Sequence, residues 1–219
     1  MLTVYGVYRS RASRVFWLLN ELDMTFEHVP VIQGYRLPDP EAEDAPFNTL
    51  SPGFLSISPA GAVPVLKDGD FVLSESLAMT LYIARKAGGS LAPANEKENA
   101  LMEQWALYGM TAIEAHALAI MYVHAEGRAK TPEGEAEIAA ETARLRRPLG
   151  VVNSHLREHG HMVGSRFTVA DINMAEIVRY AQAEPGLLSA YPEIGAWLAA
   201  CQARPAFKAM WERRLAEPA

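Results

Sequence analysis

The chain has 219 residues, of which 50% are hydrophobic and 21% charged, and this balance excludes an intrinsically disordered protein. Its formal net charge of −6 provides no basic stripe, so we expect no nucleic-acid partner. The first charges follow an apolar run, the reverse of a secretory signal. The longest apolar stretch, Met110–Val123, contains Glu114 and His116 and is too short to cross a bilayer. With a single cysteine, Cys201, we expect a cytoplasmic protein without internal disulfides or a membrane partner.

The N-terminal segment predicts a strand, a helix and a second strand. Thr3–Gly6 and Phe26–Ile32 are rich in Val, Tyr and Phe, the residues that favour strands. Between them, four apolar residues recur at the spacing of one helical face: Val15, Leu18, Leu19 and Leu22. A strand–helix–strand unit of this length indicates a parallel pair joined by a crossover helix.

A long polar segment, Gly34–Leu50, comes next, and loops of that length usually carry function or some structure of their own. After it, Val63–Leu66 and Phe71–Leu73 flank an Asp-Gly pair, which predicts a β-hairpin. The apolar pattern of Leu77–Lys86 predicts a helix that closes the first half.

The second half is helical in pattern. Residues 88–97 read as a linker, and two helical stripes follow it: Leu101, Trp105, Tyr108 and Ala112 in the first, and Ile138, Leu145, Leu149 and Val152 in the second. Thr168 and Asp171 have capping-box spacing, and Pro192 and Pro205 suit the first turns of the last two helices. The chain therefore divides into an α/β domain (residues 1–87), a linker (88–97) and an all-helical domain (98–219).

The ordered set of short motifs resembles the cytosolic glutathione S-transferases, and within them the bacterial, serine-type members. The matching elements are Val-Pro-Val-Leu at 63–66, Ser-Glu-Ser at 74–76 and Thr-Val-Ala-Asp at 168–171. Each motif alone is weak, but their order and separations are specific, and the likeness covers essentially the whole chain. The resemblance implies a thioredoxin-like N-terminal domain of order βαβαββα, an all-helical C-terminal domain, and a homodimer.

The resemblance also assigns glutathione contacts. It implies that Pro64 follows a cis bond, so that the main chain of Val63 pairs with the cysteinyl backbone of glutathione. The alternative for Pro64 is an edge-strand proline without a ligand. Ser76 would hold the γ-glutamyl carboxylate at a helix start, where unpaired N–H groups favour anions, and Glu75 would face the γ-glutamyl ammonium. Plain capping by Ser76 and a solvated Glu75 are the alternatives.

The family places a Tyr, Ser or Cys near the start of the first helix to stabilise the glutathione thiolate. No cysteine occurs in this segment, and Ser10 lies at the matching position, so Ser10 is the expected catalytic residue. Ser13 is a rival, Tyr8 could be a tyrosine-type donor, and Ser10 could be a simple helix cap.

Further expectations concern the contact to the glycyl carboxylate of glutathione, the contacts to the electrophile, and a histidine cluster. Ala62 stands where a Lys or Gln often contacts the glycyl carboxylate, so Arg36 or Asn48 from the long loop would replace it. For the electrophile we expect aromatic contacts from Tyr8, Trp105 and Tyr108, although core packing is an equal role for the last two. The histidines of "HLREHGH" (155–161) lack an accompanying acid, so no metal site is expected.

The resemblance therefore implies a glutathione transferase that uses glutathione as co-substrate, without a resident cofactor, to detoxify a small hydrophobic electrophile. A non-catalytic binding or regulatory protein of the same fold is the alternative from another class. Among enzymes, glutathione-dependent isomerisation, peroxide reduction and dehalogenation also remain open.

Overall fold

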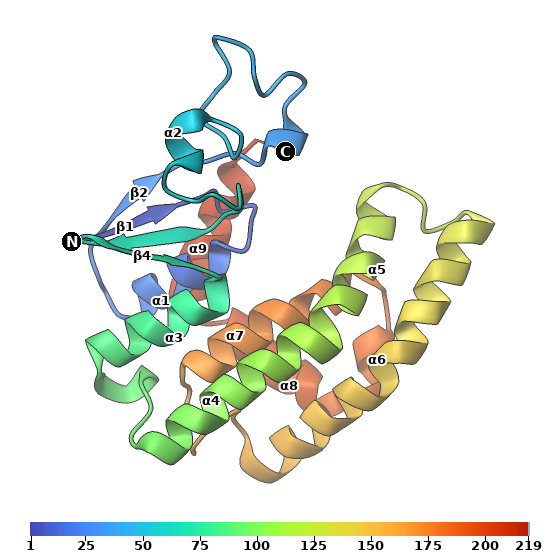
Figure 1. The fold of residues 1–219 in the computed structure, drawn as a ribbon. Coiled ribbons are helices and arrows are strands. Elements are labelled where there is room, and N and C mark those ends of the chain that lie inside the picture. Colours follow the sequence, from blue (N-terminus) through green and yellow to red (C-terminus); the bar gives the residue numbers. More distant parts are fainter. Residues whose placement is uncertain (219) are drawn as a thin grey trace. The chain divides into compact units, whose positions relative to one another are not determined.

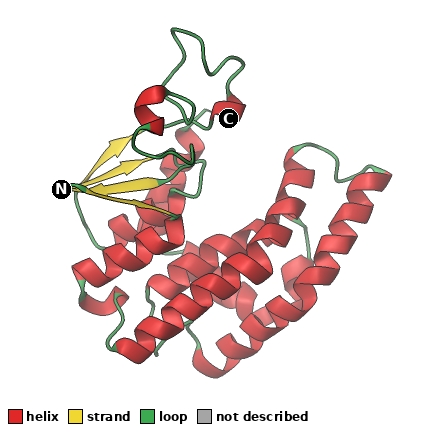
Figure 2. Cartoon of the chain, viewed as in Figure 1, coloured by secondary structure: helices red, strands yellow, loops and turns green. Residues whose placement is uncertain are grey.

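The computed structural model describes residues 1–218, which form two compact units. The α/β unit contains residues 1–87 and the segment from Pro205 onward, and the helical unit contains residues 88–204. Within the described residues, the strands all belong to the first unit, while the second holds helices and loops (Figure 2). The expected class, a thioredoxin-like α/β domain and an all-helical domain, is confirmed.

The α/β unit is built on a four-stranded sheet of order β2–β1–β3–β4 (Figure 1). Its strands are β1 (Leu2–Tyr5), β2 (Phe26–Val29), β3 (Val65–Asp68) and β4 (Phe71–Ser74). As predicted, β1 is parallel to β2, and β3 and β4 form an antiparallel hairpin. The hairpin turn is centred on Gly69 and Asp70, one residue later than the predicted Asp-Gly pair, because Gly69 supplies the positive φ of 61° that this turn needs.

Four helices complete this unit: α1 (Ser13–Glu21), α2 (Pro52–Leu55), α3 (Ser76–Ala87) and α9 (Pro205–Ala216). The domain division predicted from the sequence assigns α9 to the helical domain (98–219). In the structure α9 packs along α1 instead, with the Phe207 ring 4.9 Å from the Trp17 ring and Asn20 Nδ2 donating to the Ala206 carbonyl at 3.3 Å. An apolar helical stripe shows which face is buried but not against which partner, so the sequence pattern could not assign α9 to a unit.

The helical unit contains α4 (Glu96–Tyr108), a π-helical stretch (Gly109–Glu114), α5 (Ala115–Ala125), α6 (Pro132–His159), α7 (Val169–Val178) and α8 (Pro192–Gln202). Helix α7 is buried along its entire length. The predicted stripe of α6 is confirmed at Leu145, Leu149 and Val152, which are all buried. On α4 the predicted stripe is buried at Trp105 but not at Leu101, which is exposed while its neighbour Met102 is buried.

The predicted start signals of the later helices are confirmed. Asp171 Oδ2 accepts the N–H of Thr168 at 2.9 Å, and the Thr168 side chain accepts from the first turn of α7, which is a capping box. The second oxygen of Asp171 accepts from Trp197 Nε1 at 2.9 Å, so the cap also holds α8 against α7. Helices α8 and α9 begin at Pro192 and Pro205.

One described helix, the continuous run Glu96–Ala125, is long and apolar enough to cross a membrane by length and composition alone. It extends beyond the apolar stretch recognised in the sequence at both ends. Core helices of soluble proteins meet the same criteria, and this helix buries Met102, Ile113 and Ile120 inside the helical unit. Gly109 permits close packing on α7, because a Cβ atom there would lie 2.7 Å from Ile177 Cδ1. We interpret the run as a core helix.

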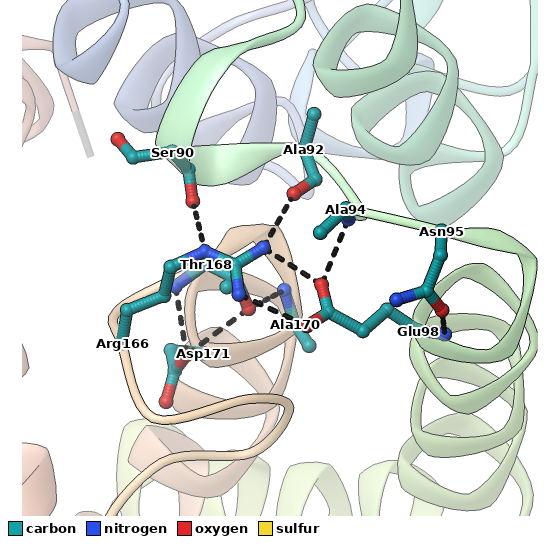
Figure 3. A network of polar contacts seen from close by, with 9 residues as sticks. All are labelled: Ser90, Ala92, Ala94, Asn95, Glu98, Arg166, Thr168, Ala170 and Asp171. Atoms are coloured by element: carbon teal, nitrogen blue, oxygen red, sulfur yellow. Dashed lines mark hydrogen bonds and ion pairs between the residues drawn. The ribbon is translucent and has the colours of Figure 1, made fainter.

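Arg166 fixes the predicted linker within the helical unit (Figure 3). Its guanidinium donates to the carbonyls of Ser90 and Ala92, each at 2.9 Å, and forms a two-pronged ion pair with Glu98 at 3.0 and 2.7 Å. Glu98 also accepts the N–H of Ala94 at 2.8 Å. The hydrogen bonds from Arg166, followed by that from Ala94, lower the pKa of Glu98 from 4.5 to about 2.

We predict that Glu98→Gln destabilises the protein by about 1–2 kcal/mol at neutral pH, because the bidentate ion pair is lost. The folded-state pKa of Glu98 is depressed, so its contribution is present above the ordinary pKa of 4.5 and is lost as the pH falls toward about 2. Urea unfolding between these pH values should show the gap between wild type and variant closing. Glu96→Gln removes an exposed charge from the same helical turn and is the matched control. An equal effect of both substitutions would contradict the prediction.

Candidate active site

Three segments of the α/β unit meet at Gly6, where β1 ends. Gly6 has a φ of 143°, and a Cβ atom there would lie 3.1 Å from Ala12 Cβ and 3.5 Å from Val63 Cβ. A Cβ atom at this position would press on Ala12, and the positive φ would strain any residue that has a side chain. The end of β1, the loop before α1 and the segment before β3 are therefore in van der Waals contact.

Ser10 lies on the loop between β1 and α1, with a half-buried side chain. Its Oγ donates to the Val7 carbonyl at 2.7 Å and accepts the N–H of Ala12 at 3.0 Å. The accepted bond fixes the oxygen at the start of α1. The hydroxyl proton, expected to be available for a ligand, instead points to the Val7 carbonyl and must rotate away from it to reach a ligand atom.

Ser13, the rival of Ser10, is the first residue of α1 and is fully buried. Its N–H donates to the Ser10 carbonyl at 3.2 Å. Ser10 is half-buried and Ser13 is fully buried, so of the two hydroxyls that of Ser10 is the more accessible to the expected thiol ligand.

The bond between Val63 and Pro64 is cis, as the resemblance implied. Val63 is half-buried and packs on the small core of Val31, Phe54 and Val65. Within residues 1–218, neither the N–H nor the C=O of Val63 has a hydrogen-bond partner. Both groups can therefore pair with the backbone of an extended peptide, as an added strand would.

The start of α3 brings a helix N-terminus and a buried arginine side chain together. Ser76 is the first helical residue, not the residue before the helix as predicted, and its buried Oγ accepts from Arg14 Nη1 at 3.1 Å. Arg14, only 1% exposed, adds a full charge to the partial positive charge of the helix N-terminus. Glu75 precedes the helix with a φ of 68° and an exposed side chain, a conformation that costs a residue with a side chain about 1–3 kcal/mol.

Asn48 does not fit the predicted role at the glycyl carboxylate. It is 1% exposed, its amide nitrogen donates to the carbonyls of Pro40 and Pro46, each at 2.9 Å, and its amide oxygen accepts the N–H of Leu50 at 2.8 Å. These bonds hold the long polar loop together. Arg36 is half-buried, and its Nη1 donates to Gln33 Oε1 at 3.4 Å, so Arg36 remains the candidate for a carboxylate partner.

Tyr8 does not fit a role as thiol donor or as an electrophile contact. It is only 4% exposed, its ring stacks on Phe16 at 4.1 Å, and its hydroxyl accepts from Arg213 Nη1 at 3.4 Å. Burial raises the pKa of Tyr8, and the neighbouring Arg213 opposes that rise only in part. The side chain is a core element of the α/β unit.

The other two predicted electrophile contacts lie in the helical unit. Trp105 is buried, with its ring 5.5 Å from the Tyr108 ring and 4.6 Å from the His155 ring. Tyr108 is half-buried, and this burial raises its pKa. Core packing therefore describes the contacts of Trp105, while Tyr108 retains an accessible edge.

Sequence reasoning missed two groups that contact the predicted site residues. Arg14 sits in an otherwise apolar helical run, and this break in the pattern was the available signal. Glu217 accepts the backbone N–H groups of Tyr8 and Arg9 at 2.7 and 2.8 Å. It lies more than 200 positions away in the sequence, so no local pattern could reveal it.

Comparison with known proteins shows the family of the chain. Residues 4–91 match the family model of the glutathione S-transferase N-terminal domain, and residues 100–205 match that of the C-terminal domain. Over 218 residues the chain is 32% identical to glutathione S-transferase 3 of Zea mays, covering 94% of this chain and 91% of that protein.

Two solved structures extend the comparison. Glutathione transferase F7 of Populus trichocarpa superposes with a TM-score of 0.80 at 27% identity, covering 97% of this chain and 99% of the other. A glutathione S-transferase-I bound with lactoylglutathione gives a TM-score of 0.80 at 25% identity, with coverage of 97% and 99%.

The geometry of Asn48 yields a prediction. Asn48→Ala should lower the free energy of unfolding by about 2–3 kcal/mol, because it removes three hydrogen bonds between the buried Asn48 side chain and the backbone of the loop. Chemical denaturation measures this loss, and Asp44→Ala, an exposed change in the same loop, should have little effect. A variant of unchanged stability that binds its ligand more weakly would restore the predicted binding role.

Proposed function

Because the chain belongs to the glutathione S-transferase family and is a glutathione transferase, we propose that Ser10 stabilises the thiolate of bound glutathione for attack on a small hydrophobic electrophile. The observation that carries this proposal is the arrangement around the first turn of α1. Ala12 holds Ser10 Oγ and contacts Gly6, which contacts Val63, while Arg14 holds Ser76. The three expected glutathione contacts thus border one helical turn.

The chemistry requires a thiolate, because a thiol with a pKa of about 8.5 is only a few per cent ionised at neutral pH. Lowering that pKa by two units takes about 2.7 kcal/mol of preferential stabilisation of the anion. One charge-assisted hydrogen bond supplies about 1.5–3 kcal/mol. A single hydroxyl can therefore provide most of the effect.

Ser10 can provide this bond after one rotation about its side chain. The Ser10 hydroxyl stops donating to the Val7 carbonyl and donates its hydrogen bond to the sulfur instead. The N–H of Ala12 continues to donate to Oγ. That donation polarises the hydroxyl and makes it a stronger donor to the thiolate. The thiol proton is released to solvent, and the electron pair of the sulfur forms the new bond to the electrophile while the leaving group departs with the electron pair of the bond that breaks.

The other expected contacts are assigned to the rest of the tripeptide. We assign its cysteinyl backbone to the N–H and C=O of Val63, beside Pro64. Its γ-glutamyl carboxylate fits the start of α3, where Ser76 and the charge of Arg14 meet. The exposed carboxylate of Glu75 would face the γ-glutamyl ammonium, and Arg36 would bind the glycyl carboxylate.

Other parts of the proposal rest on the family resemblance. For the electrophile we propose a contact with Tyr108, whose side chain is half-buried. We propose a cytoplasmic homodimer with a role in detoxification, in which glutathione is a co-substrate and no resident cofactor takes part. Exposed apolar side chains on both units are available to a partner subunit, among them Phe47, Leu50, Leu107 and Met110.

We predict that Ser10→Ala lowers kcat/KM for conjugation by about 10- to 100-fold, the loss expected for one charge-assisted hydrogen bond. The pKa of bound glutathione, followed by the ultraviolet absorbance of its thiolate, should rise. Ser13→Ala and Tyr8→Phe are the controls, because both side chains are buried. Unimpaired conjugation in Ser10→Ala, or a larger loss in either control, would remove the serine assignment. No binding of glutathione to the wild type would favour the non-catalytic alternative.

For Arg36 we predict that Arg36→Gln raises the KM for glutathione about three- to tenfold and leaves kcat unchanged, because a carboxylate contact far from the sulfur acts on binding alone. Steady-state kinetics at varied glutathione separates the two constants. Lys208→Gln, an exposed change on α9, controls for the lost charge. A fall in kcat at constant KM would contradict this assignment.

A further inference from the structure

The loop that carries Ser10 is a β-turn. The N–H of Ser10 donates to the Val7 carbonyl at 3.1 Å, so Val7 and Ser10 are the ends of the turn and Tyr8 and Arg9 its central residues. In such a turn the N–H groups of the two central residues do not take part in the closing bond. They point outward and need partners from elsewhere.

Glu217, just after α9, provides both partners. Its Oε1 accepts the N–H of Tyr8 at 2.7 Å, and its Oε2 accepts the N–H of Arg9 at 2.8 Å. The main-chain carbonyl of Glu217 accepts in addition from Arg9 Nε at 3.0 Å. One carboxylate thus binds both outward N–H groups of the turn with short, charge-assisted bonds.

The end of α9 holds the other side of the turn as well. Arg214 Nη1 donates to the Tyr8 carbonyl at 2.6 Å, and Arg213 Nη1 donates to the Tyr8 hydroxyl at 3.4 Å. Helix α9 is itself anchored on α1 through Phe207 and Trp17 and runs beside it in Figure 1. The turn is therefore attached to a rigid helix at both its N–H and its C=O groups.

We propose that Glu217 is a positioning residue for the thiolate chemistry: its carboxylate sets the turn that places Ser10 Oγ. This inference rests on the proposed function, since it assumes that Ser10 acts on the thiol. Glu217 itself touches neither substrate nor reacting atoms. It acts through the backbone of Tyr8 and Arg9, and Ser10 is the next residue along the chain. A shift of this turn moves the Ser10 hydroxyl away from the sulfur.

Removing the Glu217 charge has two opposite effects on the pKa of the bound thiol, and this makes the proposal testable. Loss of a negative charge near the site stabilises a thiolate directly and lowers the pKa of the bound thiol. Displacement of Ser10 removes a hydrogen bond to the thiolate and raises that pKa. Other charged or titratable groups at this turn include Arg9, Arg213, Arg214, Tyr8 and His28, whose ring lies 5.4 Å from that of Tyr8, and the variants at position 217 retain all of them.

The test uses Glu217→Gln, which keeps the shape of the side chain but offers one acceptor and turns an NH2 group toward the second backbone N–H. We expect kcat/KM for conjugation to fall about tenfold and the pKa of bound glutathione to rise by about one pH unit. Glu212→Gln removes a charge from the exposed face of α9 and is the matched control. Thermal unfolding is recorded for each variant, and Glu217→Asp replaces Glu217→Gln if the latter does not fold.

A double-mutant cycle with Ser10→Ala completes the test. If Glu217 acts through Ser10, the substitution at 217 has no further effect on the thiol pKa in the Ser10→Ala background. An unchanged or lowered pKa in Glu217→Gln, or a rise of the same size in both backgrounds, overturns the proposal even if stability falls. An inert Ser10→Ala substitution is a different result, because it removes the proposed function of Ser10 whatever Glu217→Gln does.

Discussion

The close approach at Gly6 is the constraint on which the rest of the α/β unit depends. A glycine with a positive φ lets β1, Ala12 and Val63 approach one another closely, so the end of the sheet strand, the start of α1 and the segment before β3 meet at one point. From there, Ala12 fixes the hydroxyl oxygen of Ser10, while Val63 keeps both backbone groups without an internal partner among residues 1–218. An extended peptide ligand can pair with the backbone of Val63 and have its thiol near the hydroxyl of Ser10.

Electrostatics divides the same region into two parts. The start of α3 combines a helix N-terminus with the buried Arg14, which suits a carboxylate. The Ser10 turn has its outward N–H groups already occupied by Glu217, so these groups cannot bind an anionic ligand there. In the proposed complex, the γ-glutamyl carboxylate of glutathione would lie at the start of α3, and the hydroxyl of Ser10 would be the group at the turn that responds to the thiolate.

The sequence predicted what local patterns can encode: the four strands, the hairpin, the capping box at Thr168 and Asp171, and the cis bond before Pro64 by resemblance. It misplaced groups whose partners are distant or non-periodic. The sequence suggests Asn48 as a ligand residue, but its amide nitrogen donates to main-chain carbonyls of its own loop. No pattern of side chains in the sequence reveals such acceptors. For the same reason neither the packing of α9 on α1 nor the bonds of Glu217 could be foreseen.

The central claim is that glutathione lies along Val63 with its sulfur at Ser10, and a crystal structure of the complex tests it most directly. The account predicts the sulfur within hydrogen-bond distance of Ser10 Oγ, the cysteinyl N–H and C=O paired with the backbone of Val63, and the γ-glutamyl carboxylate at Ser76. A sulfur atom resting against another side chain, or a tripeptide bound away from the start of α3, would contradict it.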